Sequence, residues 1–249
     1  MEYTKLGKTG LTVSVAGLGC GGGSRLGMNR GLSTAESVAL VHTAMDLGVN
    51  YLDTAAVYGT EGIVGEAIKI APRDEIFVAT KASIRKGMEL IPVEDVLDSL
   101  DNSLRVLDSD YVDVFQFHAV PPALYGRIRD EYVPALLREK EKGKLRHLGL
   151  TETPPNDAAG EMLVKASRDP VWEVIMLGFH MMHQGARRNC FPGTMENGIG
   201  TVLMFVVRSI FSIPGRLEET VDALATEGKI PPWLAKSDGP LDFLIRDGG

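Results

Sequence analysis

Short apolar runs alternate along this chain with longer segments in which apolar residues recur at helical spacing. The runs lie at residues 16–20, 49–53, 76–80, 112–117, 145–150, 174–179 and 201–207. Several are apolar on consecutive residues, which is typical of parallel strands covered on both faces. The alternation of strands and helices predicts repeated βα units around a parallel sheet.

Turn and cap residues mark the ends of several predicted elements. Ser33 and Glu36 form a capping box for a helix that Gly48 ends. Ahead of the first run, residues 2–6 and 11–15 predict a β-hairpin around the turn residues GKTG. Further helices are predicted from Pro92 onward, over residues 134–142 and over residues 216–228.

Composition bounds the class of partner. The 249 residues suit a single barrel domain, because α/β barrels often run to about 250 residues. A net charge of -7 disfavours nucleic acid and anionic membranes as partners. The first residues lack the apolar core of a secretory signal, and no apolar run reaches about 18 residues. We therefore expect a cytoplasmic protein with a small-molecule partner; the oligomeric state stays open.

The chain has two cysteines, Cys20 and Cys190, which are too few for a disulfide framework and lack the spacing of a metal site. Both are predicted to be free thiols, and no metal is expected.

Four polar residues follow three neighbouring strands. Asp53 ends the second run, Tyr58 follows it, and Lys81 and His118 come directly after the third and fourth. In a parallel barrel these strand ends carry the active site. A phenol with a pKa near ~10 is a poor proton carrier at neutral pH, and a nearby ammonium lowers that pKa. We expect Lys81 to supply this charge, Asp53 to hold Lys81, and His118 to donate a hydrogen bond to a carbonyl oxygen.

Several motifs occur together in this chain: NYLDTAxxYG (50–59), ATK (79–81), residues 103–113, FQFH (115–118) and residues 143–151. In this order and spacing they resemble the aldo-keto reductases over about residues 1–207. The resemblance implies a (β/α)₈ TIM-type barrel with an N-terminal hairpin. It also implies NAD(P)H-dependent reduction of an aldehyde or ketone, or oxidation of an alcohol or sugar, with Tyr58 as the general acid.

The resemblance also implies a cofactor site. NADP is the expected cofactor, with NAD possible. The expected contacts are Gly19, Gly21, Arg25, Thr151, His180 and Phe205, of which Phe205 stacks on the nicotinamide ring.

The chain departs from the family pattern in two places. Thr151 and Glu152 stand where the family has Ser-Asn, and His180 replaces an amide side chain. No eighth strand and helix with the phosphate-binding loop is recognisable after residue 207. We therefore expect one domain over residues 1–249, an incomplete barrel with seven strands. A substitute strand from residues 240–246 or from another subunit stays open.

Two alternative functions remain. Barrel aldolases use a lysine at a strand end as a Schiff-base nucleophile, and Lys81 could act in the same way. The same barrel could bind the cofactor as a non-catalytic or regulatory protein. A third reading, a Rossmann turn made by Gly17, Gly19 and Gly22, is rejected because no helix opens directly after it.

Overall fold

The computed structural model describes residues 1–87, 89–153, 157, 159–180, 183–206, 210 and 213–236. The chain divides into two compact units. The first comprises Met1–Gly178 and Gln184–Met204, and the second comprises Phe179–His183 and Phe205–Gly249. A single domain over residues 1–249 stays a prediction, and residues 240–246 lie outside the described residues.

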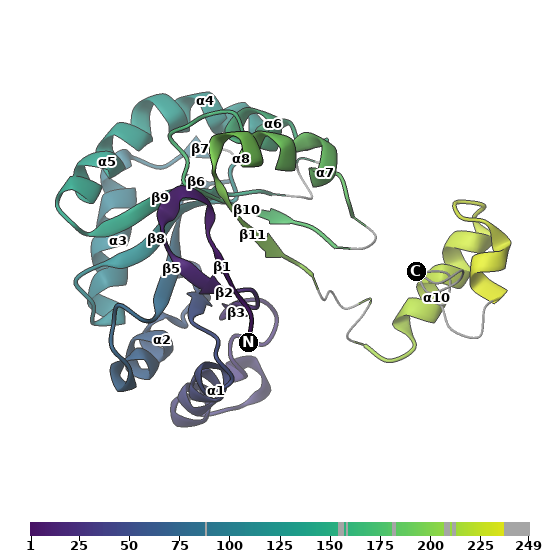
Figure 1. Ribbon diagram of the computed structural model, residues 1–249, viewed down its shortest axis with the longest axis horizontal. Coiled ribbons are helices and arrows are strands. Elements are labelled where there is room, and N and C mark those ends of the chain that lie inside the picture. Colours follow the sequence, from purple (N-terminus) through teal and green to yellow (C-terminus); the bar gives the residue numbers. More distant parts are fainter. Residues whose placement is uncertain are drawn as a thin grey trace. The chain divides into compact units, whose positions relative to one another are not determined.

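The first unit contains one sheet of seven parallel strands (Figure 1). In spatial order they are β11 (Gly200–Met204), β10 (Val174–Gly178), β9 (Leu145–Thr151), β8 (Val112–His118), β5 (Phe77–Ser83), β4 (Tyr51–Asp53) and β3 (Leu18–Gly19). Each strand neighbours the next of the seven in chain order, as βα units require. The seven apolar runs thus predict the seven strands, and the sheet is an incomplete (β/α)₈ barrel.

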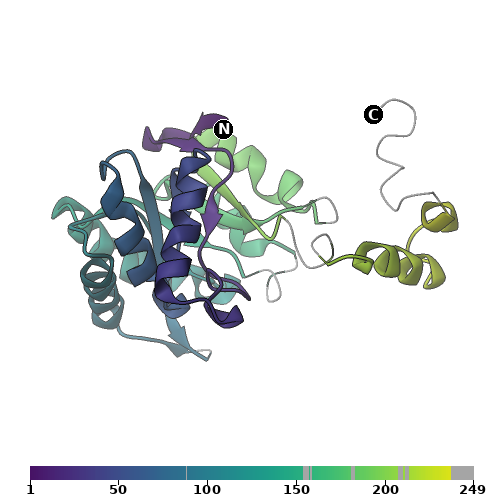
Figure 2. The same cartoon turned by 90° about the horizontal axis from the view of Figure 1, so that it is seen from below.

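Helices cover the outside of this sheet (Figures 1 and 2). They are α1 (Thr34–Asp46), α2 (Glu61–Ala67), α3 (Val93–Leu107), α4 (Tyr125–Arg127), α5 (Val133–Glu141), α6 (Glu161–Ala166), α7 (Ala186–Asn189) and α8 (Phe191–Asn197). The predicted capping box is present: Ser33 Oγ accepts from the Glu36 amide and the Glu36 carboxylate accepts from the Ser33 amide. Pro92, expected in the first turn of α3, is instead the N-cap residue just before it, and its side chain makes no capping hydrogen bond.

The hairpin of β1 (Tyr3–Lys5) and β2 (Thr12–Ser14) packs at the amino ends of the strands. Leu6, Leu11 and Val13 from this segment pack with residues of the barrel strands, including Tyr51 and Phe77 at the starts of β4 and β5. The hairpin therefore packs against the core at the amino ends of the barrel strands, whereas the carboxyl ends of these strands are where an active site is expected.

Three elements differ from expectation. Strand β5 continues to Ser83, three residues past the predicted end. A small hairpin of β6 (Arg85–Lys86) and β7 (Glu89–Leu90) follows it, and a π-helical turn, Ile128–Tyr132, joins α4 to α5.

In the second unit, α10 (Arg216–Thr226) confirms the predicted helix and is followed by a 3₁₀ helix, Pro232–Lys236. Within the described part of the chain, every helix is too short or too polar to cross a membrane.

Candidate active site

The four predicted catalytic residues come together at the carboxyl end of the sheet. Asp53 ends β4, Lys81 lies near the end of β5 and His118 ends β8. Tyr58 ends a 3₁₀ turn, Ala56–Tyr58, which directly follows β4. Since β4, β5 and β8 are adjacent parallel strands, their carboxyl ends meet at one edge.

A buried ion pair lies at the base of this group. Lys81 Nζ donates to both carboxylate oxygens of Asp53 and to the Thr54 carbonyl oxygen, each at 2.7 Å. The side chains of Lys81 and Asp53 are 1% and 12% exposed. Burial raises the pKa of Asp53, while the Lys81 charge opposes that rise. The three acceptors match the three protons of the ammonium, which fixes its position.

The pKa of Tyr58 moves in the direction opposite to the one expected from the sequence. Burial raises it to about 12, and the charge of Asp53 adds to this rise. Lys81 Nζ is only 5.3 Å from the centre of the Tyr58 ring, but its charge is balanced by the Asp53 carboxylate in contact with it. The phenol is therefore protonated at neutral pH and has a proton that it can donate.

His118 lies beside Tyr58. The two rings meet edge to face with their centroids 5.7 Å apart. Burial, followed by the Lys81 charge, lowers the pKa of His118 to about 4. The imidazole is thus neutral at pH 7 and offers one N–H. Within the described residues, no hydrogen bond engages the Tyr58 hydroxyl or the His118 ring nitrogens, so both are available to a common acceptor.

Gln116 is a member of this site that the sequence analysis did not select. It pairs with Lys81 across β5 and β8, and it is fully buried. Its side chain lowers the pKa of Asp53, although its amide makes no hydrogen bond of standard geometry. The signal was present in the sequence: Gln116 is the polar residue inside VDVFQF and shares the face of His118, two residues on.

The three predicted contacts in the first loop have different surroundings. Gly19 is exposed, and a Cβ there would meet nothing within 4 Å. At Gly21 a Cβ would lie 2.4 Å from the Tyr58 ring, so the backbone of Gly21 packs directly against that ring. Arg25 is exposed and has a left-handed backbone, φ +46°. Gly21 is therefore needed for the position of Tyr58, and contact of all three with a cofactor stays a prediction.

Thr151 ends β9 and is 2% exposed. Its hydroxyl accepts from the Ala119 amide at 2.7 Å. The adjacent Glu152 is buried, its carboxylate accepts from the Gly178 amide at 2.8 Å, and burial raises its pKa. These side chains tie β9 to the ends of β8 and β10.

His180 and Phe205 belong to the second unit. His180 forms an isolated antiparallel bridge with His183. Phe205 directly follows β11, is 40% exposed and has φ +66°. A bulky residue seldom adopts this left-handed conformation, and such strain often accompanies function. Their roles as cofactor contacts stay predictions.

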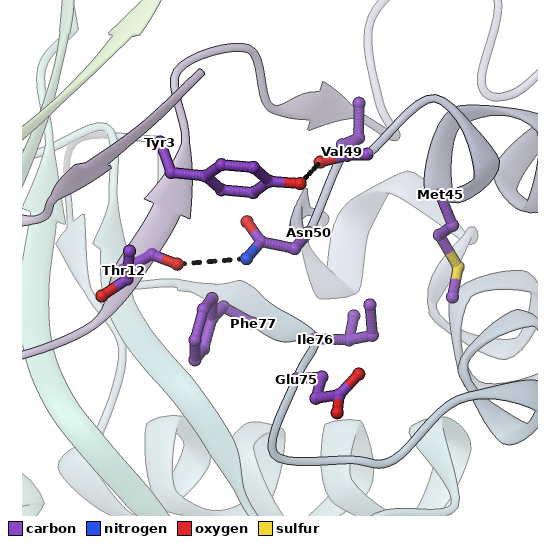
Figure 3. Close-up of a pocket in the computed structure, with 9 residues that line it drawn as sticks. Tyr3, Thr12, Met45, Val49, Asn50, Glu75, Ile76 and Phe77 are labelled. Atoms are coloured by element: carbon purple, nitrogen blue, oxygen red, sulfur yellow. Dashed lines mark hydrogen bonds between the residues drawn. The ribbon is translucent and has the colours of Figure 1, made fainter. Parts of the chain in front are cut away.

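A pocket of about 360 Å³ opens at the other end of the strands (Figure 3). Two of its polar side chains make hydrogen bonds within the protein. The Tyr3 hydroxyl donates to the Gly48 carbonyl at 2.9 Å, and the Asn50 amide donates to the Thr12 carbonyl at 3.1 Å. Since these bonds join the hairpin to the barrel, the pocket is a structural junction, remote from the four catalytic candidates.

Comparison with known proteins gives a consistent assignment. The model of the Aldo/keto reductase family matches residues 18–219. The chain is 37% identical to L-galactose dehydrogenase of Arabidopsis thaliana over 160 residues, which are 62% of this chain and 49% of that protein. It is 29% identical to the aldo-keto reductase YhdN of Bacillus subtilis over 213 residues, 82% of this chain and 61% of that protein.

A solved structure supports the same fold. The holo form of aldo-keto reductase AKR11C1 from Bacillus halodurans superposes with a TM-score of 0.65 and 29% identity, covering 82% of this chain and 65% of that one. The chain spans about half the length of the first two curated relatives it matches, at 49% and 50%.

Proposed function

Because the chain belongs to the aldo/keto reductase family, we propose that it is an NAD(P)H-dependent oxidoreductase that reduces an aldehyde or ketone. The observation that carries the proposal is the pair of Tyr58 and His118, two neutral donors in contact beside a buried ion pair. The substrate is a small carbonyl compound or sugar, and we expect the protein to act in the cytoplasm.

Tyr58 and His118 both donate to the substrate carbonyl oxygen in this proposal. The carbonyl carbon of the substrate would accept a hydride from a nicotinamide cofactor when that cofactor is bound. The oxygen then gains negative charge, and Tyr58 transfers its phenolic proton to it, which completes the alcohol. His118 stabilises the same developing charge with its N–H. A pKa of about 12 keeps the Tyr58 phenol protonated at neutral pH, which is the state that a proton donor in carbonyl reduction needs. Oxidation of an alcohol or sugar is the reverse reaction at the same site.

Lys81 and Asp53 hold this arrangement. The ammonium 5.3 Å from the Tyr58 ring centre stabilises the phenolate left after proton transfer. Asp53 holds the Lys81 ammonium in place through two hydrogen bonds. Lys81 therefore acts on the phenolate product more than on the resting phenol.

The residues around the site fit a nicotinamide cofactor in part. The unengaged Tyr58 and His118 groups and the open space at Gly19 are compatible with a bound ligand. We propose that Gly19, Gly21, Arg25, Thr151, His180 and Phe205 contact the cofactor, with Phe205 stacking on the nicotinamide. NADP is the proposed form, with NAD as the alternative.

The geometry disfavours the Schiff-base alternative. A nucleophilic lysine needs a free lone pair, whereas Lys81 is 1% exposed and donates to three acceptors at 2.7 Å. Trapping with borohydride in the presence of a carbonyl substrate should leave Lys81 unmodified.

The proposal is tested by titrating the chain with NADPH and NADH while protein fluorescence is followed, then by screening carbonyl substrates for consumption of the reduced cofactor. Saturable binding with turnover supports the proposal. Saturable binding of NADPH or NADH, with no turnover of any of the carbonyl substrates screened, supports the regulatory alternative. No binding at millimolar cofactor contradicts both.

A further inference from the structure

The chain turns sharply directly after His118. Ala119 has a left-handed backbone, φ +57°, and the next residue, Val120, is fully buried. A residue with a Cβ is sterically disfavoured in this region. The turn therefore needs support from its surroundings.

Thr151 supplies this support. Its hydroxyl accepts from the Ala119 amide at 2.7 Å, and its carbonyl accepts from the Val120 amide at 2.9 Å. Strand β9 pairs with β8 up to Leu150 opposite Phe117, so Thr151 lies next to the end of β8. Both amides of the turn are thus bound to one residue, which is itself 2% exposed.

We propose that Thr151 is a positioning residue, whose hydroxyl fixes the Ala119 turn and thereby holds the His118 ring against Tyr58. The inference rests on the proposed function for the role of His118 in orienting the carbonyl. The link between Thr151 and His118 is a property of the folded chain and is measurable without turnover.

This role differs from the cofactor contact proposed for Thr151. The hydroxyl oxygen is used as an acceptor, while its own proton remains a donor. A contact with the cofactor would therefore add to the bond with Ala119. The two roles predict different results when the hydroxyl is removed in the absence of cofactor.

The test compares Thr151→Val, which keeps the shape without the hydroxyl, with Thr151→Ser, which keeps the hydroxyl. The readout is the pKa of His118, followed by NMR of histidine-labelled, cofactor-free chain. His118→Asn assigns the His118 signal among the five histidines. Thr80→Val is the matched control, because Thr80 is also a buried strand threonine, but its hydroxyl donates to Glu61.

In wild type the pKa of His118 is lowered to about 4. We expect Thr151→Val to raise it by about one unit, because a displaced ring is better hydrated. Thr151→Ser and Thr80→Val should leave it unchanged. In steady state, Thr151→Val should lower kcat about 10-fold, an effect typical of a misplaced catalytic group, with little change in KM for the cofactor.

Ala119→Gly provides a second variant. Glycine adopts the left-handed conformation freely, so Thr151→Val should shift the His118 pKa less when Ala119→Gly is also present. If the single variant Thr151→Val fails to fold, the double variant with Ala119→Gly should still fold. A wild-type His118 pKa in folded Thr151→Val overturns the proposal; weaker NADPH binding alongside that pKa assigns Thr151 to the cofactor instead. Because no turnover is needed, the result is independent of whether Tyr58 proves to be the general acid.

Discussion

The rings of Tyr58 and His118 lie 5.7 Å apart, edge to face, and their environments move the two pKa values in opposite directions. Burial raises the pKa of Tyr58 to about 12 and lowers the pKa of His118 to about 4. Both side chains are therefore neutral over a wide range around pH 7, and each presents a hydrogen-bond donor. Two donors that share one acceptor are what a carbonyl oxygen needs when it gains negative charge.

Tyr58→Phe removes the proposed proton donor with little change in shape. We expect kcat for carbonyl reduction to fall by about 10²- to 10⁴-fold, the usual contribution of a general acid. The Kd for NADPH, measured by fluorescence titration, should stay nearly unchanged. Reduction by the phenylalanine variant at the wild-type rate would remove Tyr58 from the mechanism.

Gly21→Ala tests the packing of the first loop against Tyr58. The new Cβ would lie 2.4 Å from the ring, which is too close for both to keep their positions. We expect a loss of activity about as large as that of Tyr58→Phe if the ring is displaced, with near-wild-type circular dichroism. Gly23→Ala is the matched control, since a Cβ there meets nothing within 4 Å. Equal activity of both variants would mean that the loop yields without moving Tyr58.

The strands were predictable because buried parallel strands require consecutive apolar residues. Strand β5 shows the limit of this rule. It continues through Lys81 to Ser83, and Lys81 is compatible with a buried strand only because Asp53 of the adjacent β4 neutralises it. The β6–β7 hairpin was missed because IRKGMEL has no strand-like alternation.

The candidate site was predictable in its membership and less so in its electrostatics. Strand-end positions brought Asp53, Lys81 and His118 together. The contact of Asp53 with Lys81 was expected, but the direction of the Tyr58 pKa shift depends first on the burial of the phenol, which the sequence does not state. The hydrogen bond from the Ala119 amide to the Thr151 hydroxyl could not be predicted either, because it depends on how closely the ends of two neighbouring strands approach each other.

The Asp53–Lys81 pair gives a prediction for stability. Asp53→Asn and Lys81→Met should each destabilise the fold by about 3–5 kcal/mol, because each leaves a buried partner without its counterion. The double variant should lose less than the sum of the two, since it leaves no unpaired charge. Urea unfolding of the four proteins measures this coupling. Additive losses would show that the pair contributes independently through its other contacts, such as Lys81 to the Thr54 carbonyl.

His118 links stability to pH. In the unfolded chain its pKa is near 6.5, whereas burial and the Lys81 charge lower it to about 4 in the folded chain. Between these values the unfolded chain binds a proton that the folded chain does not. The free energy of unfolding should therefore fall as the pH drops from 6.5 to 4, and this contribution is fully present above pH 6.5.

His118→Asn isolates that contribution, because asparagine does not titrate. We expect the wild type to lose more stability than His118→Asn between pH 7 and pH 4.5 in urea unfolding, while carboxylates and the other histidines affect both proteins alike. Parallel curves for the two proteins would mean that His118 is hydrated and titrates near its ordinary pKa. That result would also mean that the His118 imidazole is charged at mildly acidic pH. A charged His118 would repel the Lys81 ammonium, which the phenolate of Tyr58 requires.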